Sequence, residues 1–209
     1  MKKPKEPKFY RFFARPFIGL PLKFFIRPKV IGYENIPKEG RCIIAGNHTN
    51  NLDSVILAAI NKRVVHFLAK DSLLKGWKKP LFVGMAIIPV NRAIHDKNAL
   101  NNAIIALEEE RLIGVFPEST INRTKETTIL PFKIGAVKMA AETGAPIVPF
   151  VITGEYKLFS KDLCIEFLKP IKVSKKEDLT KDNEKLMKII SKKLEEKRKW
   201  NGISRYELL

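Results

Sequence analysis

A histidine and an aspartate five residues apart are the side chains of this sequence best suited to acid–base chemistry. His48 and Asp53 lie in the segment Gly-Asn-His-Thr-Asn-Asn-Leu-Asp at 46–53, after an apolar run and before a helical pattern. A turn and the first turn of a helix can bring the carboxylate to one ring nitrogen, which leaves the other nitrogen as a general base. No Gly-x-Ser-x-Gly elbow accompanies the pair. The nucleophile can therefore be a hydroxyl group of the substrate itself.

Three further segments place polar or charged side chains close to apolar runs. Arg92 follows Ala-Ile-Ile-Pro-Val-Asn, Glu118 follows Leu-Ile-Gly-Val-Phe-Pro, and Lys133 stands at the start of a helical pattern. Open α/β sheets bind ligands at the carboxyl ends of their strands. A cation beside a helix N-terminus also suits an anionic ligand. We therefore expect these side chains at the same sheet edge as His48.

The elements that must position these residues alternate along the chain. Residues 96–110 repeat apolar side chains at the helical period, and Gly144 closes a similar pattern at 132–144. This alternation predicts an α/β domain over 31–209, with a largely parallel central sheet flanked by helices. The expected strands cover 41–46, 64–69, 86–90, 112–116, 146–152 and 164–168, and the expected helices cover 51–60, 72–83, 96–110, 132–144 and 182–198.

Taken in order, the polar segments and the run Ile-Val-Pro-Phe at 147–150 resemble the motifs of the glycerophospholipid acyltransferase superfamily. They look most like those of the bacterial 1-acylglycerol-3-phosphate acyltransferases, and the similarity covers about residues 30–175. Each segment is weak alone, but the combination is specific. The resemblance implies transfer of a fatty acyl group from a thioester to the free hydroxyl of a lysophospholipid. The expected acceptor is 1-acylglycerol-3-phosphate, and the product is phosphatidic acid.

The resemblance also implies roles for single residues. His48 and Asp53 match the catalytic Asn-His-x4-Asp motif, in which Asn47 is expected at the substrate site. Arg92 matches an arginine that helps to bind the phosphate of the acceptor. The Phe-Pro-Glu-Gly-Thr-Arg motif is matched by Glu118, Ser119 and Thr120, and the fourth motif is matched by Pro149.

Two positions depart from the family pattern. Ser119 stands where the family has glycine, and Ile121 stands where it has a phosphate-binding arginine. Arg123 or Lys133 is a candidate to replace that charge at the substrate site. If neither reaches the phosphate, the acceptor carries a different headgroup or none.

The implied mechanism is direct transfer in a complex of both substrates. His48 removes the acceptor's proton, the hydroxyl attacks the thioester carbonyl, and N–H groups stabilise the oxyanion. No cofactor is expected, because the acyl thioester, of either acyl-carrier protein or coenzyme A, is a co-substrate. No metal site is expected either, since Cys42 and Cys164 lack metal-ligand spacing and are interpreted as buried free thiols.

Residues 1–30 form a segment of different character. Nine of them are Lys or Arg, only Glu6 is acidic, and many phenylalanines lie between the cations, while Pro16 and Pro21 divide any helix into short pieces. Aromatic rings beside cations suit the headgroup–acyl boundary of an anionic membrane. We predict an amphipathic helical membrane-surface segment. A helical hairpin that packs on the domain is the alternative.

The net charge of +17 calls for an anionic partner. The chain has no apolar run of about 18 residues and no signal-peptide pattern, so the expected location is peripheral or monotopic at the cytoplasmic face of a membrane. A basic nucleic-acid-binding module is a rival interpretation, but no binding motif for nucleic acid appears. A thioester hydrolase that uses the same histidine on water is the second rival.

Overall fold

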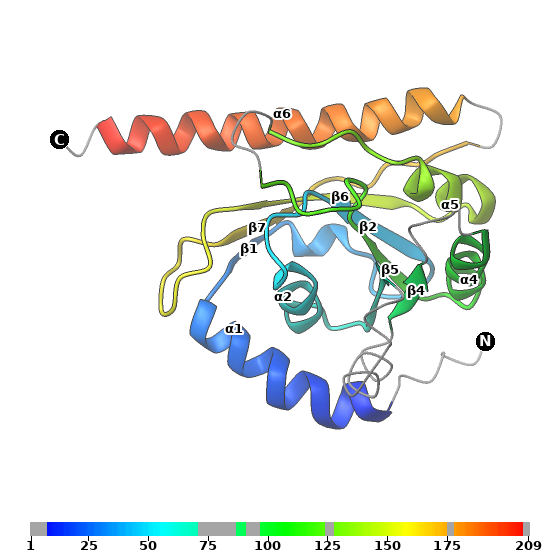
Figure 1. The fold of residues 1–209 in the computed structure, drawn as a ribbon, viewed down its shortest axis with the longest axis horizontal. Helices are drawn as coiled ribbons and strands as arrows, with labels where there is room; N and C mark the ends of the chain where they lie inside the picture. Colours follow the sequence, from blue (N-terminus) through cyan, green and yellow to red (C-terminus); the bar gives the residue numbers. More distant parts are fainter. Residues whose placement is uncertain (1–7, 71–86, 91–96, 124–127, 175–177, 207–209) are drawn as a thin grey trace.

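The structure is a computed structural model that describes residues 8–70, 87–90, 97–123, 128–174 and 178–206 of the 209-residue chain. Its strands are β1 (Lys29–Ile31), β2 (Cys42–Gly46), β3 (Val65–Lys70), β4 (Ile88–Val90), β5 (Leu112–Val115), β6 (Ile147–Thr153) and β7 (Cys164–Phe167). Within this part of the chain they form one sheet in the order β1-β7-β6-β2-β5-β3-β4 (Figure 1). Strands β6 and β7 pair antiparallel, and the other neighbours pair in parallel.

Helices cover both faces of this sheet (Figure 1). One face carries η1 (Tyr10–Gly19), α1 (Leu20–Ile26) and α2 (Asp53–Ile60), and the other carries α4 (Lys97–Glu108), α5 (Gly135–Thr143) and α6 (Leu179–Tyr206). A short 3-10 helix, η2 (Tyr33–Asn35), follows β1. Because successive strand residues point to opposite faces, Cys42 and Ile44 of β2 pack into the first core, and Ile43 and Ala45 pack into the second. The site described below lies at an edge of this three-layer structure.

The predicted fold class, an α/β domain with a largely parallel sheet, is confirmed. Helix α6 buries the predicted stripe of Leu186, Ile190 and Leu194, and Gly144 ends α5 in the left-handed region at φ 69°. The helix expected at 72–83 lies outside the described residues. Strand β1 was not predicted, because its three residues are only half-buried or exposed and form no apolar run.

The N-terminal helices are attached to the domain by their inner side. The hydroxyl of Tyr10 donates to the carbonyl oxygen of Ala58 at 3.0 Å, and Ile26 is buried in the core beside α2. Pro16 lies inside η1 and Pro21 lies in the first turn of α1, which begins directly after η1. The expectation that these prolines divide the segment into separate helical pieces is therefore wrong, since the helical backbone runs from Tyr10 to Ile26. Among the residues that the structure describes, no helix is both long and apolar enough to cross a bilayer.

Both cysteines carry free thiols, as predicted, but they differ in exposure. Cys42 is buried in β2, and burial raises the pKa of its thiol to about 12. Cys164 is half-buried rather than buried. Because the thiolate is the reactive form, Cys42 is a packing residue.

Candidate active site

The candidate site lies where the carboxyl ends of β2 and β5 meet. The two strands are parallel neighbours, with Ala45 opposite Val115. Helix α2, which follows β2, packs on one face of the sheet, whereas α5, which follows β5, packs on the other face. A switch point of this kind is the usual ligand site in open α/β sheets. His48 follows β2 and Glu118 follows β5, so both reach this edge.

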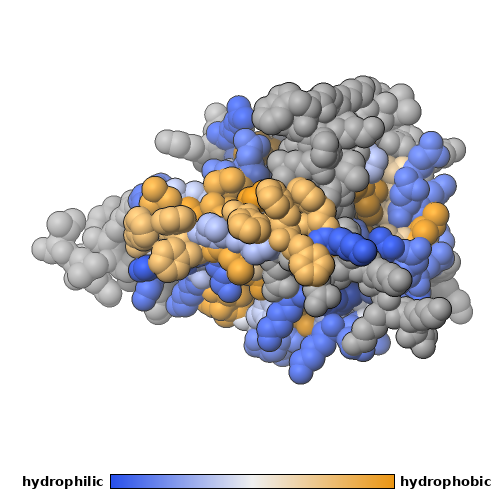
Figure 2. All heavy atoms as spheres, turned by 90° about the horizontal axis from the view of Figure 1, so that it is seen from below, coloured by the Kyte–Doolittle hydropathy of each residue, from blue (hydrophilic) through white to orange (hydrophobic). Residues whose placement is uncertain are grey.

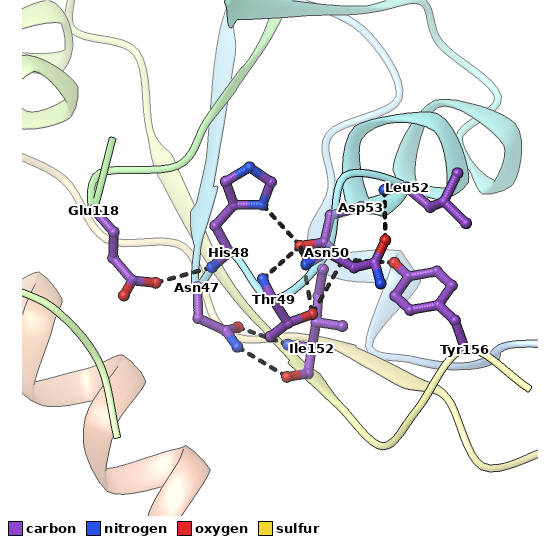
Figure 3. Close-up of polar contacts among 9 residues, drawn as sticks. All are labelled: Asn47, His48, Thr49, Asn50, Leu52, Asp53, Glu118, Ile152 and Tyr156. Atoms are coloured by element: carbon purple, nitrogen blue, oxygen red, sulfur yellow. Dashed lines mark hydrogen bonds and ion pairs between the residues drawn. The ribbon is translucent and has the colours of Figure 1, made fainter. Parts of the chain in front are cut away.

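His48 and Asp53 are in direct contact, as their spacing predicts. Nδ1 of His48 lies 2.8 Å from Oδ2 of Asp53 (Figure 3). Asp53 is the first residue of α2 and its side chain is fully buried, whereas the side chain of His48 is 17% exposed. The carboxylate favours the tautomer with its proton on Nδ1. The other ring nitrogen, Nε2, is then unprotonated and able to accept a proton.

The carboxylate of Asp53 is held by several donors besides the imidazole. The backbone N–H groups of Thr49 and Asn50 donate to Oδ2 at 2.6 and 2.9 Å. The Tyr156 hydroxyl donates to Oδ1 at 2.6 Å. Burial, and then the nearby negative charge of Asp53, raise the pKa of Tyr156, which therefore remains a protonated donor. These bonds fix the carboxylate before any substrate binds.

The loop after β5 holds His48 from a second direction. The ring of Phe116 stacks on the imidazole with 4.0 Å between centroids, and the N–H of Asn122 donates to the carbonyl oxygen of His48 at 3.0 Å. No described residue forms a hydrogen bond with Nε2, and Figure 3 shows this nitrogen pointing away from Asp53. The ring is thus fixed in position while its basic nitrogen faces outward.

Glu118 bonds to the backbone on both of its carboxylate oxygens. One oxygen accepts from the N–H of His48 at 2.9 Å, and the other accepts from the N–H of Leu130 at 2.7 Å. Burial raises the pKa of Glu118, and the two backbone N–H groups reduce this increase without cancelling it. The side chain is 5% exposed and ties three loop segments together.

Asn47 extends the pairing of β2 with β6 by means of its side chain. Its Nδ2 donates to the carbonyl oxygen of Ile152 at 2.9 Å, and its Oδ1 accepts from the N–H of Ile152 at 2.7 Å. The amide therefore mimics a peptide unit of a strand. Just before it, a Cβ on Gly46 would lie 2.4 Å from atoms of Phe150, so only glycine fits there. Both residues fix the point at which the His48 loop leaves the sheet.

Comparison with known proteins identifies the family of this α/β domain. The family model described as "Acyltransferase" matches residues 27–153, which include the dyad and Glu118. The chain belongs to the acyltransferase family. The match ends three residues before Tyr156.

Relatives of this acyltransferase family member carry a common name. The 1-acyl-sn-glycerol-3-phosphate acyltransferase of Borreliella burgdorferi is 38% identical over 137 residues, which are 64% of this chain and 54% of that protein. The enzyme of the same name from Saccharomyces cerevisiae is 34% identical over 167 residues, 74% of this chain and 54% of that protein. The chain thus spans about half the length of these relatives.

A solved structure shares the fold of this family member. The 1-acyl-sn-glycerophosphate acyltransferase from Thermotoga maritima superposes with a TM-score of 0.67 at 22% identity. The superposition covers 90% of this chain and 83% of that one. At this identity the likeness concerns the fold.

Ser119 has a backbone conformation that explains why the family motif has glycine at this position. Its φ is 58°, in the left-handed region that side chains with a Cβ rarely adopt. The N–H of Ser119 donates to the carbonyl oxygen of Phe116, which closes a tight turn directly beside the His48 ring. In this member of the family a serine adopts the turn despite its Cβ.

The remaining predicted site residues lie outside this bonded network. The side chains of Thr120, Arg123 and Lys133 are exposed, and Lys133 precedes the start of α5. Arg92 lies outside the described residues; β4 ends two residues before it. No described group of three or more His, Cys, Asp or Glu side chains has the arrangement of a metal site.

Two residues of the network were not predicted from the sequence as parts of the site. Tyr156 is 103 residues from Asp53, and no spacing rule connects a tyrosine in a loop with a carboxylate that far away. Phe116 belongs to one of the recognised motifs, but its ring looks like ordinary core. Its place directly after a strand and two residues before Glu118 was the available signal.

Proposed function

We propose that the protein transfers a fatty acyl group from an acyl thioester to the free hydroxyl of 1-acylglycerol-3-phosphate, which gives phosphatidic acid. The observation that carries this proposal is the 2.8 Å contact between His48 and Asp53, with Nε2 directed away from the carboxylate. Family membership and the common name of the relatives supply the reaction and the acceptor.

In the proposed reaction His48 is the general base and the acceptor is the nucleophile. Nε2 takes the proton of the acceptor hydroxyl as its oxygen forms a bond to the thioester carbonyl carbon. The tetrahedral intermediate collapses, the carbon–sulfur bond breaks, and the thiolate takes the proton back from the imidazolium. Asp53 stabilises the imidazolium that exists between these two transfers. No acyl-enzyme is required.

Three further residues position the base in this proposal. Tyr156 holds Asp53, Glu118 holds the backbone of His48, and Asn47 holds the end of β2. Their polar atoms are used by the protein itself, which supports positioning roles for them rather than direct contact with substrate. A shift of about 1 Å in a general base can cost roughly 100-fold in rate.

We propose that basic side chains bind the phosphate of the acceptor. Arg92 is the first candidate by its place in the motif, and the side chains of Arg123 and Lys133 are exposed on loops connected to the site. The N–H of Lys133 donates to the carbonyl oxygen of Pro117, which keeps its backbone beside the Glu118 turn. Thr120 lies in that turn with an exposed side chain and adds a hydroxyl donor at the substrate site in this proposal. The hydroxyl of Ser119 beside it donates to the carbonyl oxygen of Pro117 at 3.5 Å.

The proposed setting is the cytoplasmic face of an anionic membrane, bound from one side. Helices η1 and α1 bury Tyr10 and Ile26 against the domain, while Phe12, Phe17 and Phe24 remain exposed. The high positive charge suits an anionic bilayer and an anionic thioester of either acyl-carrier protein or coenzyme A.

A product assay by mass spectrometry tests the reaction. The protein is supplied with each acyl thioester in turn and with a panel of lysolipids that differ in headgroup, and the His48→Ala protein serves as the control. Phosphatidic acid formed only by the wild type supports the proposal. Thioester loss at the full rate without any acceptor would instead indicate a hydrolase.

A further inference from the structure

Most of the large exposed apolar side chains in the described part of the chain gather on one face and come from two distant segments. Figure 2 shows them grouped over the side that carries η1 and α1. Phe12, Phe17 and Phe24 belong to these helices, and Leu158 belongs to the loop between β6 and β7; each of the four is 61–69% exposed. Phe159 beside it is 58% exposed. A group of this size on a soluble surface marks an interaction site.

The loop at 154–163, here called the β6–β7 loop, is fastened to the C-terminal end of α1. The N–H of Phe159 donates to the carbonyl oxygen of Phe25 at 2.6 Å, and their rings meet edge to face at 5.4 Å. The guanidinium of Arg27 lies 5.6 Å from the ring centre of Phe24 and 5.7 Å from that of Phe159. One cation thus joins rings from both elements into a single surface.

The backbone of Phe159 is also unusual. Its φ is 57°, in a region that bulky residues rarely adopt. A local strain of this kind persists where surrounding contacts enforce it, and it is found at functional positions. Here it accompanies two consecutive exposed apolar side chains, Leu158 and Phe159, at the surface of the loop.

We propose that the β6–β7 loop is a second lipid-binding element, which enters an anionic bilayer beside η1 and α1. This inference deepens the proposed function and rests on it for the identity of the surface. Charge complementarity supports a bilayer as the occupant, since the two segments that carry the rings also carry exposed cations: Lys23, Arg27, Lys29, Lys157 and Lys161, of which Lys157 pairs with Glu155. Rings at the acyl boundary with cations in the headgroup layer are the arrangement of interfacial segments.

The β6–β7 loop also links the proposed lipid-binding surface with the dyad. Tyr156, which bonds to Asp53, lies only three residues before Phe159, which contacts α1. The loop therefore connects the proposed lipid-binding surface with the buried carboxylate through a few residues of backbone.

Sedimentation with vesicles tests this inference without any catalysis. The double variant Leu158→Ser/Phe159→Ser is compared with the wild type on sucrose-loaded vesicles of phosphatidylcholine and phosphatidylglycerol. Loss of two apolar side chains is expected to lower the partition coefficient at least about fivefold. The matched control is Ile105→Ser, which removes an exposed apolar side chain from α4 on the other face and should change the coefficient less than about twofold.

Two further variants protect the test against misfolding. Phe159→Leu keeps an apolar side chain and should bind vesicles almost as well as the wild type. In the variant Leu158→Trp, brominated lipid should quench a larger share of the tryptophan fluorescence than it does in the wild type. Wild-type binding by the double variant, or no quenching at Trp in place of Leu158, overturns the inference. The inference is also overturned if the wild type forms a dimer that the double variant does not form, while both proteins bind vesicles equally.

The two proposals fail in different ways. If the wild-type protein binds vesicles through this loop but makes no acylated product, the proposed reaction is wrong and the lipid-binding surface stands. If product forms while the double variant binds vesicles like the wild type, the reaction stands and the loop is not a lipid-binding element.

Discussion

The hydroxyl of Tyr156 lies 2.6 Å from Oδ1 of Asp53, on the carboxylate oxygen opposite the one that contacts His48. The imidazole and the phenol therefore contact the carboxylate from two sides (Figure 3). The backbone N–H groups of Thr49 and Asn50 also donate to Oδ2. A His–Asp pair that is predictable from the sequence becomes a three-residue network through a tyrosine that is not.

Tyr156→Phe tests the contribution of the third residue. The variant leaves Oδ1 with only the longer bond from the Thr49 hydroxyl at 3.2 Å. We expect kcat to fall roughly tenfold with little change in KM, and the free energy of unfolding to fall by about 1–2 kcal/mol, because a hydrogen bond to a charged group is lost. Steady-state kinetics and urea unfolding measure both. An unchanged kcat in a destabilised protein would make Tyr156 a purely structural residue.

His48→Ala removes the proposed general base. We expect turnover to fall by roughly 10²–10⁴-fold, the usual contribution of a positioned base. The backbone N–H that donates to Glu118 is still present in this variant, so the loop should keep its shape. Circular dichroism and thermal unfolding provide the control for folding. Near-normal turnover by a correctly folded variant excludes His48 as the base.

Glu118→Gln should change how stability depends on pH. Burial raises the pKa of Glu118 above its ordinary value of 4.5, so the folded protein holds this proton more tightly than the unfolded chain. The stabilisation linked to this proton is complete below pH 4.5 and is lost as the pH rises through the folded pKa.

The stability of the wild type relative to Glu118→Gln should therefore be greatest near pH 4 and smaller at pH 7. Urea unfolding of both proteins across this range measures the difference. Other carboxyl groups, such as Glu110, whose pKa is lowered by its bond to Arg41, affect both proteins equally and cancel. A difference that grows as the pH rises contradicts the assignment.

Ser119→Gly should stabilise the protein. A residue with a Cβ at φ 58° is strained by about 1–2 kcal/mol, and glycine loses about 0.5–1 kcal/mol of this gain through its greater freedom when unfolded. A net gain of up to about 1.5 kcal/mol corresponds to a Tm increase of up to roughly 3–6 °C. Ser119→Ala removes the hydroxyl and keeps the Cβ. Equal Tm values for the Gly and Ala variants would show that the strain is absent.

The sequence predicts six of the seven described strands, most of the helices and the dyad for physical reasons. Buried strands of a parallel sheet need continuous apolar runs, and α6 needs its apolar stripe, so both patterns are visible in the sequence. The contact between His48 and Asp53 is local in sequence, and loop geometry nearly determines it. Long-range contacts such as the one between Tyr156 and Asp53 depend on how loops from separate strands meet.

The functions of Asn47 and Glu118 show a second limit on what the sequence alone can predict. The motif marks both residues as important, and substrate binding was the natural expectation. In the structure their polar atoms bond to the backbone of Ile152, His48 and Leu130. Every residue type except proline offers the same backbone N–H and C=O groups. A sequence pattern therefore cannot show which backbone group a side chain will bond to.

The internal bonds of Asn47, Asp53 and Glu118 have a consequence for the timing of events during a catalytic cycle. The hydrogen bonds of these three side chains form when the protein folds. We therefore expect the segment around His48 to keep its conformation when an acceptor binds. The conformational entropy of this segment is then lost once, during folding, and not again in each catalytic cycle. An inhibitor designed against the unliganded conformation of this segment would therefore bind it without a conformational change of the protein.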